Sequence, residues 1–293
     1  MYKRQQSGDK AWWFDFSTVT NAGAYYVYDN IKNVASYKFY IRDDIYENVL
    51  KTAVRSYYYQ RCGTAKSSPF ADAGYSDGAC HIGTQQDTDC RLVTNTSPIT
   101  SKNLSGGWHD AGDYNKYVNF TWEALHNLLL AYEENPTVWT DDYDLPESAN
   151  GIPDLLDEVK FEMDWLLKMQ NTDGSVLCVV GGGDASPPSA DGSARFYGPA
   201  TTSASYTAAS NFALAAIQFK SLGIPAMTTY GNTLQTAAEN AWTWANANPN
   251  ITFYNQANNL AAGEQEFSSN PVDYAYAILT RKISAATFLY KLQ

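Results

Sequence analysis

The hydrophobic pattern of the chain changes near residue 42, and this change constrains the fold more than any other feature. Before it, Phe14, Phe16 and Val19 alternate with other residues, and the aromatic stretches at 25–28 and 37–41 are typical of short strands. After it, apolar residues recur every three or four positions, which is the period of a helix. We therefore expect an all-β part, residues 1–41, followed by an all-α part, residues 42–293.

The all-α part contains six segments with a helical pattern. In the first, Ile45, Val49, Ala53 and Tyr57 mark one face. No strand pattern recurs between the segments, which favours helices joined as hairpins in a ring over a βαβ sheet. The predicted helices cover about residues 43–57, 118–132, 153–166, 203–222, 232–247 and 272–286.

Two long segments between these helices, residues 61–117 and 178–202, are rich in Gly, Ser, Pro, Asp and Thr. Loops of this length in a compact domain are usually functional. The second could line a sugar cleft through Arg195, Phe196 and Tyr197, or it could be a mobile surface loop. The sequence alone leaves both interpretations open.

Charge and composition exclude several classes of partner. The net charge is −11, so we expect no nucleic-acid partner, because binding a polyanion requires clustered Lys and Arg. No apolar run reaches the ~18 residues of a membrane span, so we expect no membrane partner. Aromatic residues make up 14% of the chain. Their flat faces suit sugar rings, although aromatic side chains also fill ordinary cores.

The densest candidate for chemistry is the segment Gly106–Tyr114, in which Asp110 and Asp113 are separated only by Ala and Gly. Small residues allow a tight turn, so both carboxylates can face one point. There they can polarise and deprotonate a water, which is the task of the general base in an inverting glycosidase. From spacing alone, a turn followed by a helix cap before Val118 is the alternative.

Residues 106–118, GGWHDAGDYNKYV, resemble the signature of glycoside hydrolase family 9, an endoglucanase family with an (α/α)6 barrel. The stretch from Glu147 to Gln170 is similar to the family's helix after this signature. Residues 57–63, 79–81 and 14–29 resemble the subgroup with an immunoglobulin-like module before the barrel. The resemblance implies the N-terminal half of an (α/α)6 barrel, preceded by the end of that module.

The resemblance also implies roles in cleaving internal β-1,4 bonds of cellulose or a related β-glucan. Asp113 matches the catalytic base and Asp110 the residue that helps hold the nucleophilic water. Trp108 and His109 match flanking positions that shape the substrate site, to which we add Tyr197 as a candidate substrate contact.

The family's catalytic acid is a glutamate far downstream, and neither Glu264 nor Glu266 matches it. Asp110 and Asp113 are too close in sequence to lie on both sides of a sugar. We therefore expect a fragment that is inactive alone. The rival interpretation, a non-catalytic carbohydrate-binding protein, is disfavoured by the intact aspartates.

A second constellation joins Cys62, Cys80 and His81. Its spacing fits a zinc site or a disulfide between Cys62 and Cys80 equally well. The resemblance implies a structural zinc. The subgroup's other histidine appears as Lys116 here, so the fourth ligand is Cys90 or His109.

Two further expectations concern the remaining cysteine and other ions. Cys178 is expected to be a buried thiol. Calcium occurs in the family, but the acidic cluster expected near residues 264–282 is thin here.

The start of the chain, MYKRQQSGDK, lacks the apolar core of a signal peptide. The resemblance nevertheless implies a secreted protein acting on an extracellular polysaccharide, and we expect it to be a monomer.

Overall fold

The computed structural model describes residues 2–3, 10–11, 14–254, 260 and 271–293. The chain divides into two compact units, residues 1–53 and 54–293. Within the described residues, no helix is long and apolar enough to cross a membrane.

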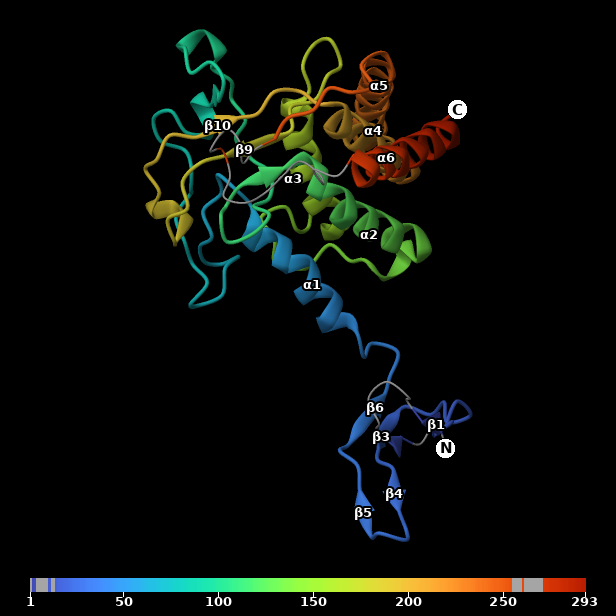
Figure 1. The fold of residues 1–293 in the computed structure, drawn as a ribbon. Helices are drawn as coiled ribbons and strands as arrows, with labels where there is room; N and C mark the ends of the chain where they lie inside the picture. The colour runs from blue at the N-terminus through green and yellow to red at the C-terminus, as the bar shows by residue number, and fades with distance from the viewer. Residues whose placement is uncertain (1, 4–9, 12–13, 255–259, 261–270) are drawn as a thin grey trace. The chain divides into compact units, whose positions relative to one another are not determined.

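The first unit contains short strands (Figure 1). Strand β3 (Gly23–Tyr25) pairs antiparallel with β6 (Phe39–Ile41), and β4 (Tyr28–Asp29) pairs antiparallel with β5 (Val34–Ala35). Strands β1 (Tyr2–Lys3) and β2 (Lys10–Ala11) form a further antiparallel pair. Phe16 packs on Phe39 with ring centroids 5.2 Å apart. That this unit ends an immunoglobulin-like module stays a prediction, as does the boundary at residue 41.

All six predicted helices are present in the described residues (Figure 1). Helix α5 begins earlier than predicted, because Pro225 fits the first turn, where its missing N–H group leaves no hydrogen bond unmade. The helices are α1 (Glu47–Gln60), α2 (Thr121–Glu134), α3 (Asp154–Met169), α4 (Thr202–Ser221), α5 (Pro225–Ala247) and α6 (Pro271–Lys291).

The predicted inner face of α1 is wrong by one residue. Val54 and Tyr58 are buried, whereas Val49 is 60% exposed and Ala53 is exposed. Apolar residues occupy two adjacent stripes of this helix, and spacing alone cannot decide which stripe faces the core.

Helix α4 is the centre of the second unit and packs against α2, α5 and α6. Nearly all of its side chains are buried, including Ala208, Ala209 and Ala213. Small side chains let the neighbouring helices approach closely. The resulting core supports the loops that carry the candidate site.

A small mixed sheet connects the two long loops, with strand order β7-β10-β9-β8. The sequence interpretation that no strands lie between the helices is therefore wrong, because strands of two or three residues are too short to show alternation. The sheet joins residues just after Asp113 to the loop at 178–202. Its strands are β7 (Arg91–Leu92), β8 (Lys116–Tyr117), β9 (Val179–Gly181) and β10 (Phe196–Tyr197).

Candidate active site and metal centre

Backbone pairing places the signature segment against the end of α1. The Cys62 N–H donates to the Gly107 carbonyl at 2.8 Å, and the His109 N–H donates to the Gln60 carbonyl at 2.9 Å. Gly107 has φ +76°, and a Cβ atom there would lie 2.6 Å from the Trp165 ring. Glycine is therefore required for this segment to pack on α3.

Two glutamates of α3 hold Trp108 in place. The Trp108 backbone N–H donates to Glu162 Oε2 at 2.6 Å, and its indole Nε1–H donates to Glu158 Oε2 at 3.2 Å. Glu158 also accepts from Arg61 Nε at 2.9 Å. Burial raises the pKa of Glu162 to about 8 and, against the opposing effect of Arg61, that of Glu158 to about 7.

The signature aspartates differ in environment. Asp113 is half-buried, and its Oδ2 accepts hydrogen bonds from Tyr117 Oη at 3.0 Å and from Asn115 Nδ2 at 2.8 Å. Asp110 is exposed. Two donors on one oxygen fix the direction of the Asp113 carboxylate, as a general base requires.

An aromatic pocket of about 190 Å³ lies beside this segment, and Asp110 borders it. Tyr117 lines the pocket and its hydroxyl donates to Asp113, so it connects the pocket with the Asp113 carboxylate. Trp108 and His109, the predicted substrate contacts, both line the pocket, but both side chains are largely buried. Their contact with substrate stays a prediction. The complete lining is Tyr57, Gln60, Trp108, His109, Asp110, Tyr117, Phe120, Thr121, Ala124 and Glu162.

The structure does not support the proposed sugar cleft in the second long loop. Tyr197 is 4% exposed and its hydroxyl donates to the Thr100 carbonyl at 2.7 Å. Arg195 is fully buried. Neither side chain lines the aromatic pocket. Tyr197 lies in β10 and Arg195 directly precedes that strand, and both side chains are buried.

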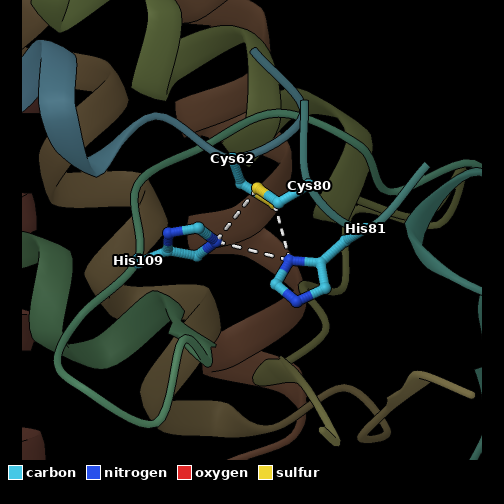
Figure 2. A group of neighbouring side chains, drawn as sticks. All are labelled: Cys62, Cys80, His81 and His109. Atoms are coloured by element: carbon cyan, nitrogen blue, oxygen red, sulfur yellow. Dashed lines mark hydrogen bonds between the residues drawn. The ribbon is translucent and has the colours of Figure 1, made fainter. Parts of the chain in front are cut away.

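Four buried donor groups converge on one point: Cys62, Cys80, His81 and His109 (Figure 2). The two Sγ atoms lie 4.0 Å apart. His81 Nδ1 lies 3.4 Å from His109 Nε2 and 3.5 Å from Cys62 Sγ. Cys80 Sγ lies 3.7 Å from His109 Nε2.

These separations are those of a tetrahedral zinc ligand set. With Zn–S of about 2.3 Å and Zn–N of about 2.0–2.1 Å, tetrahedral geometry separates two sulfurs by about 3.8 Å. The same geometry separates two nitrogens by about 3.3 Å and a sulfur from a nitrogen by about 3.5 Å. The four printed separations therefore fit a tetrahedral zinc site, and the two cysteines and two histidines are ligands that zinc accepts.

The fourth member of the group is His109. Cys90 lies outside it, buried in the hydrophobic core, so the structure does not support the prediction of Cys90 as a ligand. Cys178 is also buried. None of the four cysteines, all within the described ranges, forms a disulfide.

A buried ionic cluster surrounds the metal group. Asp87 binds Lys116 Nζ and Arg195 Nε, each at 2.6 Å, and accepts from Cys62 Sγ at 3.3 Å. Lys116 and Arg195 lower the pKa of Asp87 despite its burial. Lys116 is thus a salt-bridge partner of Asp87. The hydrogen bond with Cys62 lowers the pKa of Cys80 to about 6, which favours the thiolate.

Sequence reasoning missed Glu158, Glu162, Asp87 and Asp191. For the two glutamates a signal exists: they are one turn apart and flank the apolar stripe that the pattern assigned to the inside of α3. Acidic groups beside a buried stripe need partners. For Asp87 and Asp191 the sequence offers no comparable signal, since neither lies in an element long enough to show a periodic pattern.

A second acidic group, Asp141, Asp154 and Asp157, closes the loop before α3. Asp141 accepts from the Gly151 N–H at 2.6 Å, and Asn150 donates to both oxygens of Asp157 at 3.1 Å. These bonds join the carboxylates to the backbone and side chains of the same loop. Much of the region where calcium ligands were expected, including Glu264 and Glu266, lies outside the described residues.

A helical core with paired aspartates beside an aromatic pocket defines the class of helical-barrel glycoside hydrolases. Residues 46–293 match the profile described as "Glycosyl hydrolase family 9", and the chain belongs to this family. The helices accordingly form part of an (α/α)6 barrel.

Curated relatives include Endoglucanase D of Acetivibrio thermocellus, 33% identical over 270 residues, which are 90% of this chain and 41% of that protein. The Cellodextrinase of Butyrivibrio fibrisolvens is 31% identical over 257 residues, 85% of this chain and 44% of that protein. The chain thus spans less than half the length of these relatives.

Two solved structures are similar. A metagenome-derived glycoside hydrolase family 9 endoglucanase has a TM-score of 0.74 at 33% identity, covering 94% of this chain and 48% of that one. A Zn-binding triple mutant of the family 9 endoglucanase J30 has a TM-score of 0.71 at 30% identity, covering 92% and 49%.

Proposed function

We propose that the whole protein hydrolyses internal β-1,4-glucosidic bonds of cellulose or a related β-glucan with inversion at the anomeric carbon. The observation that carries the proposal is the Asp113 carboxylate, held by Tyr117 and Asn115 next to an aromatic pocket bordered by Asp110. The names of the endoglucanase relatives support the substrate class.

In this mechanism Asp113 removes a proton from the attacking water and Asp110 helps to hold that water. The roles fit the two environments. Asp113 is fixed by two donors, whereas Asp110 is exposed at the pocket and reachable by solvent. Trp108 and the other aromatic residues offer flat faces to the sugar rings.

Inversion also needs an acid on the opposite side of the scissile bond, roughly 6.5–9.5 Å from the base. Glu162 borders the same pocket, but it is fully buried and its Oε2 already accepts from Trp108. It is therefore unsuited to protonate a leaving sugar. We assign the acid to a glutamate outside this chain, which makes residues 1–293 inactive alone.

The second part of the proposal is a structural zinc bound by Cys62, Cys80, His81 and His109. Four protein donors leave no position for a catalytic water. Because His109 immediately precedes Asp110, the site ties the catalytic segment to the end of α1. The zinc site would thereby keep Asp110 and Asp113 in position beside the aromatic pocket.

The test is hydrolysis of carboxymethylcellulose by the whole protein, measured as reducing sugar, with the anomer of fresh product followed by NMR. We expect turnover and the α-anomer as first product. Failure to release sugar from any soluble β-glucan would contradict the proposed activity, and a β-anomer would contradict inversion alone.

A further inference from the structure

A buried carboxylate oxygen beside the metal group lacks a hydrogen-bond partner. Asp191, in the loop between β9 and β10, has a side chain only 2% exposed. Its Oδ1 accepts from the Ser193 N–H at 2.7 Å, whereas its Oδ2 has no partner in the described part of the chain. A buried acceptor without a donor is costly and calls for a specific explanation.

That oxygen faces the metal group. Asp191 Oδ2 lies 3.7 Å from Nε2 of His81, the ring nitrogen opposite the one that points at the other donors. A histidine bound to a metal through Nδ1 carries its hydrogen on Nε2 and needs an acceptor there. A shift of less than about 1 Å would bring the two atoms to hydrogen-bond distance.

Arg195 cannot supply that acceptor. Its Nη1 lies 3.4 Å from His81 Nε2, but a guanidinium group only donates. The same Nη1 already donates to the Gly182 carbonyl at 2.9 Å. The Arg195 contact therefore fits the tautomer of His81 that has no hydrogen on Nε2. When Nδ1 binds a metal, Nε2 carries a hydrogen, and Asp191 Oδ2 is the acceptor that lies near it.

The backbone leaves room for the carboxylate at this place. A Cβ atom at Gly183, where φ is +78°, would lie 1.9 Å from Asp191 Oδ2. The Asp191 backbone is also fixed, since Gln86 Nε2 donates to its carbonyl at 2.7 Å. The absence of a side chain at Gly183 and the hydrogen bond from Gln86 together keep Asp191 Oδ2 next to His81.

We propose that Asp191 is a positioning residue of the zinc centre: its Oδ2 accepts the Nε2–H of His81 and so fixes the ring with Nδ1 toward the ion. The inference rests on the proposed zinc site. It assigns the loop at 182–195 a structural role at the metal centre, whereas the sequence suggested that this loop could line a sugar cleft. The loop supports the metal centre, and through His109 the catalytic segment.

The experiment measures zinc affinity of the full chain by competition with a chromophoric chelator. We expect Asp191→Ala and the nearly isosteric Asp191→Asn to bind zinc about 10–100-fold more weakly than the wild type. Gly183→Ala should act in the same direction, because the new methyl displaces the carboxylate. The matched controls are Asp184→Asn, an exposed acid of the same loop, and Gly192→Ala, where a Cβ meets no atom within 4 Å. Both should bind like the wild type.

A second readout separates positioning from general loss of stability. In the zinc-loaded wild type, the Nε2–H of His81 should appear in ¹⁵N-resolved NMR as a slowly exchanging, hydrogen-bonded proton. In Asp191→Asn we expect it to exchange faster while His109 is unchanged. A wild type that binds no zinc overturns the proposed metal site. A wild type that binds zinc with an Asp191→Asn variant of equal affinity and an unchanged His81 signal overturns the role of Asp191 alone.

Discussion

The backbone N–H of Trp108 donates to Glu162 Oε2 at 2.6 Å, while Oε1 of the same carboxyl has no partner among the described residues. The bond joins the middle of α3 to a segment that reaches Asp110 two residues later. A side chain of helix α3 thus fixes the position of the signature segment relative to the core. The raised pKa of Glu162, about 8, means that this carboxyl is mostly protonated at neutral pH.

Replacing Glu162 should therefore destabilise the fold, and the loss of unfolding free energy should depend on whether the new side chain can accept the Trp108 N–H. Glu162→Leu leaves the buried Trp108 N–H without an acceptor, which costs about 1–3 kcal/mol of unfolding free energy. Glu162→Gln keeps an acceptor of the same shape and should cost less. Urea unfolding of both variants at pH 7 measures the difference, and equal stability of the two would show that the bond contributes little.

The raised pKa of Glu162 also predicts a pH dependence. The native pKa, about 8, lies above the ordinary glutamate value of 4.5, so the folded state holds the proton more tightly than the unfolded state. The stabilisation is complete below pH 4.5 and is lost as the pH rises toward 8. Across this range the wild type should lose stability relative to Glu162→Gln by up to about 1.4 kcal/mol per pH unit. A difference independent of pH would contradict the shift.

Arg61 and Glu158 form a buried ion pair with side chains 2% and 0% exposed. Arg61→Met leaves the Glu158 carboxyl without its cation, and we expect a loss of about 3–5 kcal/mol in unfolding free energy. Arg91→Met is the control, because Arg91 pairs with a partly exposed Asp89 and should cost at most about 1 kcal/mol. Comparable losses in the two variants would argue against a special role for the buried pair.

The helices were predictable from sequence because each carries several turns of apolar periodicity. The place of His109 in the metal group was not predictable, because sequence spacing treats Cys90 and His109 as equivalent. What separates them is the pairing of residues 107–109 with the end of α1, which brings His109 to Cys62 and leaves Cys90 in the core. Such a long-range backbone pair has no local sequence signal.

Tyr197 shows the same limit in another form. An aromatic residue in a loop rich in Gly and Pro is compatible with sugar binding or with packing. The two-residue strand β10 decides the matter by turning Tyr197 inward, and strands of this length leave no alternation in the sequence. The resemblance identified the signature residues, whereas the buried polar groups that support them required the structure.

Removing zinc should lower the melting temperature of the chain. Zinc at about 1,000 times its Kd stabilises a protein that binds it only when folded by about 4.1 kcal/mol, and a chelator abolishes that contribution. Cys62→Ser should lose the ion, and Cys90→Ser should retain it, as elemental analysis of the folded proteins can show. Retention by Cys62→Ser together with loss by Cys90→Ser would reverse the assignment of ligands.

The last prediction concerns the base. In the whole protein, Asp113→Ala should lower kcat by about 10²–10⁴, because general-base assistance is absent. Tyr117→Phe removes one of the two donors on Asp113 Oδ2 and should cost about 1 kcal/mol, or roughly fivefold in rate. Asp110→Ala should also be severe, whereas Asp184→Asn, in an exposed loop, should leave hydrolysis unchanged. Initial rates on carboxymethylcellulose, with circular dichroism to establish folding, provide the measurement. A loss of less than tenfold in folded Asp113→Ala would remove it as the base and leave Asp110 as the alternative.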